Sequence, residues 1–126
     1  MPKILVVDDD SIIRSLFKRI LSDEGFEILT ADTGEECLRA ISREGPQNIN
    51  AVFLDLKMPG SGGESTLMVL KKMYKNLPIV VITTYGDFLE RSEEIKKQVV
   101  QYVPKPFNIE EIKSILREKI IPGIKQ

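Results

Sequence analysis

Short, continuous apolar runs alternate along this chain with longer stretches that have the apolar spacing of helices, and this alternation most constrains the fold. The runs that predict strands are 3–7, 26–31, 51–54, 79–83 and 101–103. The clearest of them are apolar throughout, whereas a strand with one face in water alternates apolar and polar residues. The pattern therefore predicts a parallel sheet that is covered on both faces.

Helical patterns fill the first two intervals between these runs. After the first run, apolar residues recur along one stripe of a helix, which Gly25 ends. Thr33 and Glu36 have the spacing of a capping box, in which each side chain bonds to the backbone of the other residue. A second helix is therefore expected to begin at about Gly34.

Three more helices are expected in the rest of the chain. One covers about 64–74, and a weaker pattern covers about 87–97. The residues that the helix at 64–74 should turn inward are Leu67, Leu70 and Met73. Asn108 stands three residues before Glu111 and caps the last helix.

The resulting element order is a strand–helix unit repeated over the whole chain. Crossovers between parallel strands are right-handed, and such a chain forms an α/β domain with helices on both faces of the sheet. We expect a doubly wound, five-stranded parallel sheet of (βα)5 type, with the flavodoxin-like order 2-1-3-4-5. No internal repeat or linker divides residues 1–126, so a single domain is predicted.

Chemically active side chains stand at the predicted strand ends. They are Asp8, Asp9, Asp10, Asp55, Thr83, Thr84 and Lys105. In open α/β sheets, ligands bind at the carboxyl ends of the strands, where the strand order reverses. For the order 2-1-3-4-5 that point lies between the first and third strands, so these side chains should meet there.

Crowded carboxylates repel one another, and a divalent cation with oxygen ligands removes that repulsion. Mg²⁺ suits a site that has few protein ligands and several waters, and it points to phosphate chemistry. Thr83 and Lys105 could then hold phosphoryl oxygens. Asp55 would be free to act as a nucleophile and form an aspartyl phosphate.

Composition narrows the chemistry further. The chain contains no histidine, which excludes Ser-His and Cys-His catalysis, the common zinc sites and phosphohistidine formed on this chain. The single cysteine, Cys37, excludes an internal disulfide and is expected to be a buried structural thiol. A net charge of −1 favours neither nucleic acid nor a membrane surface as a partner. The N-terminus has no signal-peptide pattern, so a cytoplasmic location is expected.

Other functions remain as alternatives. Each acid alone could be an ordinary helix-end or turn residue, but their joint arrival at the strand ends favours a site. An aspartyl phosphatase usually has a second aspartate two residues after the nucleophile, where this chain has Lys57. A nucleotide-binding domain would have a glycine-rich motif after the first strand, where this chain has "DDDSIIR".

Four segments resemble the receiver domain of two-component response regulators. They are "KILVVDDD", "VFLDLKMPG", "IVVITTYGD" and "YVPKPFN", and the resemblance covers residues 3 to about 121, the expected domain core. It implies that Asp55 is the phosphoacceptor. It also implies that Asp9 binds Mg²⁺ directly and Asp8 through water, while Asp55 and the backbone carbonyl of Lys57 complete the protein ligands.

The resemblance assigns three further roles. Thr83 is the switch hydroxyl, Lys105 binds the phosphoryl group, and Tyr102 changes rotamer as part of the switch. The Lys105–Pro106 peptide is expected to be cis, as it is in the family. Asp10 has no ligand role in the family motif, and we expect it to cap the first helix.

The implied function is signalling rather than enzymatic turnover. The domain would take a phosphoryl group from a sensor histidine kinase or a histidine phosphotransfer protein, and catalyse only its own phosphorylation and dephosphorylation. A downstream effector would then read the face formed by the fourth helix, fifth strand and fifth helix, without direct nucleic-acid or membrane binding by this domain. A receiver used only as a docking module usually lacks a core acid or the lysine, and this chain keeps both.

The chain departs from the usual receiver pattern outside these core residues. The departures are Lys57, Thr84, 61–63 ("SGG") and 99–100 ("VV"). They concern the rate at which the phosphoryl group is lost and the surface that partners read. The sequence leaves open whether the domain acts alone or belongs to a longer regulator.

Overall fold

A parallel sheet forms the centre of the molecule. The computed structural model describes residues 1–58, 62–84, 93 and 97–124, and its sheet has the order β2-β1-β3-β4-β5. The strands are β1 (Lys3–Val7), β2 (Glu27–Ala31), β3 (Ala51–Asp55), β4 (Ile79–Thr84) and β5 (Gln101–Lys105). All neighbouring strands pair in parallel. This confirms the predicted α/β fold and its strand order.

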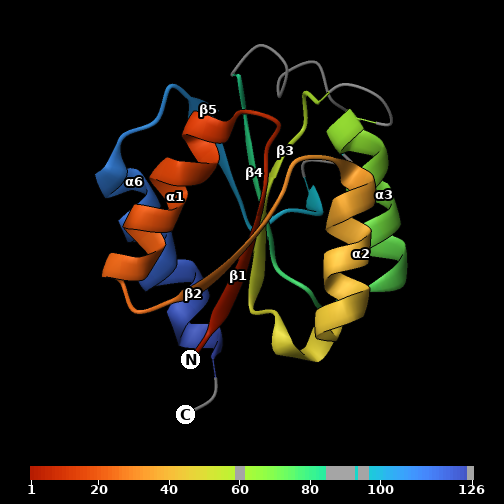
Figure 1. The fold of residues 1–126 in the computed structure, drawn as a ribbon, viewed down its shortest axis with the longest axis horizontal. Coiled ribbons are helices and arrows are strands. Elements are labelled where there is room, and N and C mark those ends of the chain that lie inside the picture. Colours follow the sequence, from red (N-terminus) through yellow and green to blue (C-terminus); the bar gives the residue numbers. More distant parts are fainter. Residues whose placement is uncertain (59–61, 85–92, 94–96, 125–126) are drawn as a thin grey trace.

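Helices cover both faces of the sheet, as Figure 1 shows. Among the residues that the structure describes, the α-helices are α1 (Ser11–Asp23), α2 (Gly34–Glu44), α3 (Gly62–Met73) and α6 (Ile109–Ile115). α1 and α6 lie on one face, and α2 and α3 lie on the other (Figure 1). Short turns are η1 (Pro46–Asn48), η2 (Leu116–Ile120) and η3 (Ile121–Gly123), and the last two continue the chain beyond α6. Within the described residues, none of the helices has the length and apolar character that a membrane span requires.

β1 illustrates why the sheet needs cover on both faces. Ile4 and Val6 join the apolar cluster on the side of α1 and α6, whereas Leu5 and Val7 join the cluster on the side of α2 and α3. All four side chains are fully buried. Because successive residues of a strand point to opposite faces, only a run that is apolar at every position can fill both clusters.

The predicted helix caps are present. The side chain of Asp10 accepts a hydrogen bond from the backbone N–H of Ile12 and begins α1. Thr33 does the same for Glu36 at the start of α2, but the Glu36 side chain pairs with Arg39, so only the Thr33 half of the expected capping box forms. Asn108 and Glu111 form a complete capping box at the start of α6. Each cap satisfies a backbone donor that has no partner within its helix.

Cys37 lies in the cluster on the side of α2 and α3 and is fully buried, as predicted. Burial raises the pKa of its thiol to about 12, because an apolar environment disfavours the thiolate. The thiol is therefore a packing group and not a reactive one.

Met73 was predicted to face inward, and that prediction is wrong. Its side chain is 59% exposed, whereas Leu67 and Leu70 are fully buried. Tyr74 packs against the core in its place. With 3.6 residues per turn, the fourth residue after Leu70 lies closer to the buried stripe than the third does.

Several predicted boundaries shift by one or two residues. β3 includes Asp55, β4 includes Thr84 and β5 extends to Lys105, so these residues end strands instead of following them. α3 begins at Gly62, before the predicted start. The helix predicted at about 87–97 lies outside the described residues, apart from positions 93 and 97.

Candidate metal centre

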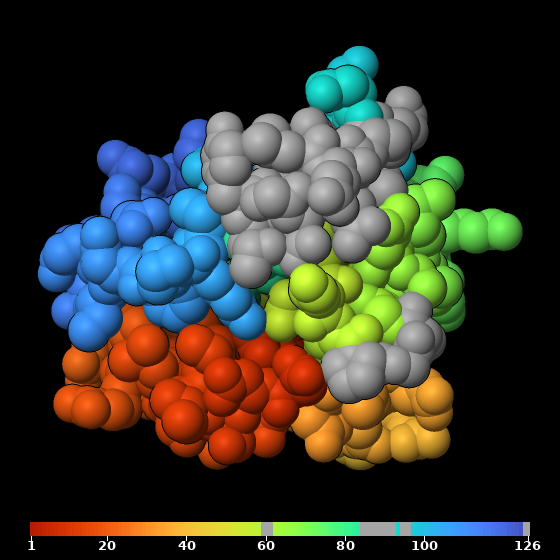
Figure 2. Space-filling model, turned by 90° about the horizontal axis from the view of Figure 1, so that it is seen from above, coloured from red at the N-terminus to blue at the C-terminus, as the bar shows by residue number. Residues whose placement is uncertain are grey.

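The polar strand ends collect at one edge of the molecule. All five strands are parallel, so their carboxyl ends share the upper edge in Figure 1. Seen from above in Figure 2, the red segment that follows β1, the yellow-green end of β3 and the blue segment after β5 come together. Residues far apart in the sequence are therefore neighbours at the point where the strand order reverses.

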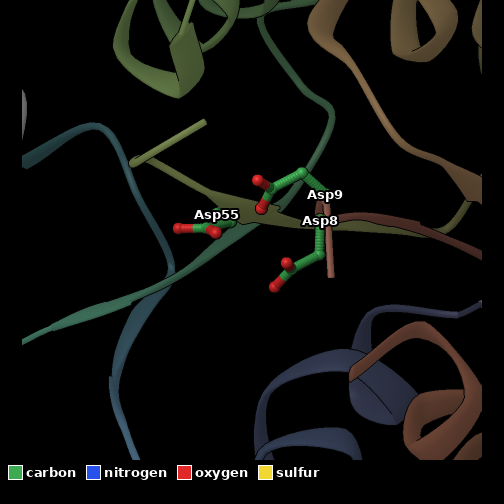
Figure 3. A group of neighbouring side chains, drawn as sticks. All are labelled: Asp8, Asp9 and Asp55. Carbon is green, nitrogen blue, oxygen red and sulfur yellow. The ribbon is translucent and has the colours of Figure 1, made fainter. Parts of the chain in front are cut away.

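Three carboxylates form the centre of the site (Figure 3). Asp8, Asp9 and Asp55 each offer an oxygen, and these three atoms all lie within 4.8 Å of one another. Asp8 and Asp9 directly follow β1, and Asp55 is the last residue of β3, the strand paired with β1. The structure thus brings together the three acids that sequence reasoning selected as metal ligands, and it separates Asp10 from them as a helix cap.

The turn between β1 and α1 is held by its own side chains. Asp8 Oδ1 accepts a hydrogen bond of 2.9 Å from the backbone N–H of Asp10. Asp10 Oδ1 in turn accepts one of 2.9 Å from Ile12 N–H. Asp8 is fully buried, whereas Asp9 is exposed. The run of three aspartates therefore has three different environments, and only two of them point into the site.

Lys105 links two of the acids. Its Nζ donates a hydrogen bond of 2.8 Å to Asp8 Oδ2 and one of 3.1 Å to Asp55 Oδ2. Burial alone would lower the pKa of Lys105, but its hydrogen bond with Asp8 and the charge of Asp55 raise that pKa above its ordinary value. The ammonium group is therefore a permanent cation at neutral pH. The Lys105–Pro106 peptide is cis, as predicted.

Asp55 is a buried acid at the end of a buried strand. Burial raises the pKa of Asp55, while the hydrogen bond from Lys57 N–H and the charge of Lys105 oppose the rise. The Lys57 N–H donates to Asp55 Oδ1 over 3.0 Å. Both oxygens of Asp55 thus have partners, one in the following turn and one on β5.

The start of α3 packs closely on this turn. Gly63 N–H donates a hydrogen bond of 2.9 Å to the Leu56 carbonyl. A Cβ on Gly63 would lie 2.0 Å from the backbone oxygen of Asp55 and 2.3 Å from the Cα of Leu56. Only glycine permits this approach, which the sequence analysis did not anticipate, since it named 61–63 only as a departure from the usual receiver pattern.

Thr83 lies beside the site, and its side-chain hydroxyl has no hydrogen-bond partner among the described residues. It stands one residue past Ile82, which pairs with Asp55, and it pairs with Pro104 next to Lys105. Its side chain is 1% exposed, and Oγ1 has no hydrogen-bond partner within the described part of the chain. A buried hydroxyl without a partner is energetically costly, and it is available to a ligand that enters the site.

Tyr102 lies on β5, where it pairs with Val81. Its ring is partly buried and packs against the apolar cluster on the side of α2 and α3. It does not belong to the acidic group itself. Its proposed role in switching stays a prediction, as does the metal-binding role of the Lys57 carbonyl.

Sequence reasoning did not select Arg14, which the structure places at the site. Arg14 Nη1 donates a hydrogen bond of 2.7 Å to the backbone carbonyl of Asp8. A single arginine in a helical segment does not belong to any sequence motif. The sequence therefore does not indicate that its side chain turns back toward the end of β1.

The site fits a small divalent cation. Its donors are carboxylate oxygens, the ligands that Mg²⁺ prefers, and they lie close enough to share one ion. No sulfur or imidazole ligand competes, because the chain has no histidine and its single cysteine is in the core. Lys105 supplies a second positive charge at the same place. Such a site can accept an anionic group with several oxygens.

Comparison with known sequences identifies similar proteins. Residues 4–117 match the sequence profile of the response regulator receiver domain. The transcriptional regulatory protein CpxR of Escherichia coli K12 is 35% identical over 117 residues, which are 93% of this chain and 48% of CpxR. The chain thus spans about half the length of the curated relatives that it matches.

Solved structures show the same fold. A response regulator receiver domain protein of Clostridium thermocellum has a TM-score of 0.86 and 30% identity, over 97% of this chain and 96% of that one. The response regulator protein TrrA of Thermotoga maritima, solved in complex with Mg²⁺ and BeF, has a TM-score of 0.82 and 37% identity. That match covers 94% of this chain and 98% of TrrA.

Proposed function

The chain belongs to the response regulator receiver domain family, and from this premise we propose that Asp55 accepts a phosphoryl group within the acidic site. The observation that carries the proposal is the meeting of Asp8, Asp9 and Asp55 at one point, where the Lys105 ammonium pairs with Asp8 and Asp55. A buried carboxylate beside two more acids and a fixed cation is suited to an oxyanion-rich group and a metal.

The transfer balances without any further reactant. A carboxylate oxygen of Asp55 attacks the phosphorus, and the P–N bond to a histidine of the donor protein breaks as the new P–O bond forms. The histidine nitrogen keeps the electron pair of the broken bond. With a small acyl phosphate as donor, a P–O bond breaks and the carboxylate of the donor leaves. The donor histidine lies outside residues 1–126, because these residues include none.

The residues around Asp55 make the transfer favourable by charge and position. Lys105 donates to phosphoryl oxygens in place of its present hydrogen bonds to Asp8 and Asp55. Mg²⁺ held by Asp8, Asp9, Asp55 and the carbonyl of Lys57 would supply the remaining positive charge against the phosphoryl oxygens. Thr83 offers its hydroxyl, which has no partner in the described residues, to the same oxygens.

The hydroxyl of Thr83 also connects the site to the surface. Once the phosphoryl group is attached, it adds roughly two negative charges, and Thr83 moves toward it. Tyr102 turns into the space that Thr83 leaves, so the packing near β5 changes between two states. We place the surface that partners read on the fourth helix of the fold, β5 and the last helix.

The partners follow from this chemistry. A sensor histidine kinase or a histidine phosphotransfer protein supplies the phosphoryl group, and a downstream effector reads the altered face. The domain itself contacts neither nucleic acid nor a membrane. It acts as a signalling phosphoacceptor that promotes its own phosphorylation and dephosphorylation, and Lys57 and Thr84, which depart from the family pattern, tune the rate of dephosphorylation.

The proposal is tested by phosphorylation with acetyl phosphate and Mg²⁺, followed by intact-mass spectrometry. We expect one added phosphoryl group that is lost in acid, and no addition to an Asp55→Asn variant. Asp23→Asn is the matched control, because Asp23 is an exposed carboxylate at the far end of α1. If Asp55→Asn gains the same label as the control, the assignment of Asp55 is wrong.

A further inference from the structure

Asp9 differs from the other two acids of the site in how it is held. Asp8 accepts hydrogen bonds from Asp10 N–H and Lys105, and Asp55 accepts them from Lys57 N–H and Lys105. Within the described residues, no hydrogen bond or ion pair reaches the exposed carboxylate of Asp9. Its direction therefore depends on the backbone that carries it.

Arg14 fixes that backbone. Its Nη1 donates a hydrogen bond of 2.7 Å to the carbonyl oxygen of Asp8, and this carbonyl belongs to the peptide unit that joins Asp8 to Asp9. Because a peptide unit is planar, a bond to its oxygen sets the orientation of the whole unit. The backbone N–H of Arg14 also donates to the Asp10 carbonyl over 3.1 Å. Arg14 therefore bonds to the carbonyls of both residues that flank Asp9.

Within the described residues, the bond to the Asp8 carbonyl is the one polar contact of the Arg14 guanidinium. Arg14 is half-buried on α1, and in the part of the chain that the structure describes it forms no ion pair with a carboxylate. A hydrogen bond from a charged donor is roughly twice as strong as one between neutral groups. The charged guanidinium of Arg14 therefore donates to a neutral backbone carbonyl at the end of β1, close to the three acids of the metal site.

We propose that Arg14 is a positioning residue for the metal site. Through the Asp8 carbonyl it holds the Asp8–Asp9 peptide unit so that the Asp9 carboxylate faces Asp55. The proposal rests on the proposed function, in which these acids bind Mg²⁺. It adds a residue that contacts neither the metal nor the phosphoryl group but determines how well the site forms.

The sign of the effect separates this role from a simple effect of charge. A positive charge near the site repels Mg²⁺, so its removal would tighten Mg²⁺ binding if charge alone mattered. If Arg14 positions Asp9, its removal weakens Mg²⁺ binding in spite of that electrostatic gain. Residues that orient metal ligands typically contribute about tenfold or more to metal affinity.

The test measures Mg²⁺ affinity by isothermal titration calorimetry on the whole chain without phosphorylation. Arg14→Met keeps the apolar stem and removes the donor and the charge, and we expect its affinity to fall about tenfold. Arg14→Lys keeps a charged donor, and we expect it to recover most of that loss. Arg19→Met is the matched control, because Arg19 is an exposed arginine of the same helix, and its affinity should not change.

Amide hydrogen exchange without metal gives a second reading. The Asp10 N–H is bonded to Asp8 Oδ1, so a looser turn should expose it, and Arg14→Met should exchange faster at Asp10 than the Arg19→Met control. The amides at the centre of α1 should exchange equally in both variants. If Arg14→Met is found to be unfolded, Arg14→Gln replaces it, because the shorter amide cannot reach Asp8.

Mg²⁺ affinity in Arg14→Met that equals or exceeds that of the unaltered chain would overturn the proposal and leave the proposed function intact. An unaltered chain that binds no Mg²⁺ at millimolar concentration would overturn both. Weaker binding in Arg14→Met together with equal weakening in Arg19→Met would also overturn it, since the effect would then belong to α1 in general.

Discussion

The acids of the site differ in solvent exposure and in the partners that hold them. Asp8 and Asp55 are buried and share the Lys105 ammonium, whereas Asp9 is exposed and depends on its backbone. Burial raises the pKa of Asp55, and nearby donors limit the rise. Asp55 is thereby kept partly desolvated beside a cation, which suits its proposed role as a nucleophile that attacks a phosphoryl group rich in negative charge.

Thr83 allows a test at the scale of one atom. Its Oγ1 is buried with no partner among the described residues, and a buried hydroxyl without a partner lowers the free energy of unfolding. Replacement of Thr83 by valine keeps the shape and removes this cost. We expect the free energy of unfolding, measured by urea denaturation, to rise by about 1 kcal/mol in Thr83→Val.

Thr66 is the control for Thr83. It is also buried, but its hydroxyl donates a hydrogen bond of 3.0 Å to the Gly62 carbonyl. Thr66→Val should therefore lower the free energy of unfolding by about 1 kcal/mol, opposite in sign to Thr83→Val. Equal losses in the two variants would show that the Thr83 hydroxyl has a partner in the folded protein.

At the scale of elements, the contact between β3 and α3 is the tightest requirement on the site. α3 begins on the turn that follows Asp55, and Gly62 adopts a positive φ of 73° there. The next residue, Gly63, lies against the backbone of Asp55 and Leu56. The position of the Asp55 carboxylate and the position of α3 therefore depend on each other.

Replacement of Gly63 by alanine should displace both the Asp55 carboxylate and the start of α3. A Cβ would lie 2.0 Å from the backbone oxygen of Asp55, and its nearest neighbours are all backbone atoms. The backbone itself must therefore move, because no flexible side chain can give way. We expect the free energy of unfolding to fall by about 3 kcal/mol in a urea titration. Gly123→Ala is the control, because nothing lies within 4 Å of a Cβ there. A loss in Gly63→Ala no greater than in Gly123→Ala would contradict the contact.

At the scale of the molecule, the sheet joins two apolar clusters into one unit. Each buried apolar residue of the strands belongs to one cluster or the other, and β1 contributes to both by alternation. The acids lie at the carboxyl ends of β1 and β3, the two strands whose following helices, α1 and α3, pack on opposite faces of the sheet (Figure 1). We propose that residues 3–121 are the core of a single domain, so that binding at the strand ends stabilises both clusters together.

This proposal predicts one cooperative thermal transition for the chain, and Mg²⁺ should move all of it. At a concentration of Mg²⁺ one hundred times its dissociation constant, the free energy of unfolding should rise by about 2.7 kcal/mol. Circular dichroism and calorimetry should report the same midpoint, and EDTA should reverse the shift. Two separate transitions, of which Mg²⁺ moves only one, would contradict a single unit.

Most of the fold could be read from the sequence because its signals are local. Runs that are apolar at every position required a sheet buried on both faces, and the caps at Asp10, Thr33 and Asn108 act within one turn of their own helix. The burial of Met73 was predicted wrongly because two positions in this helical turn, 73 and 74, lie near the buried stripe. In the folded protein Tyr74 packs against the core and Met73 is exposed.

The sequence by itself determined which groups arrive at the carboxyl ends of the strands, since strand order and strand ends place Asp8, Asp9, Asp55, Thr83 and Lys105 at one edge. Only the tertiary structure decided how those groups are held. The Arg14 bond to the Asp8 carbonyl, the close approach of Gly63 and the missing partner of Thr83 within the described residues join or separate atoms of different elements. Such contacts depend on distances across the fold, and residue order along a chain carries no such distances.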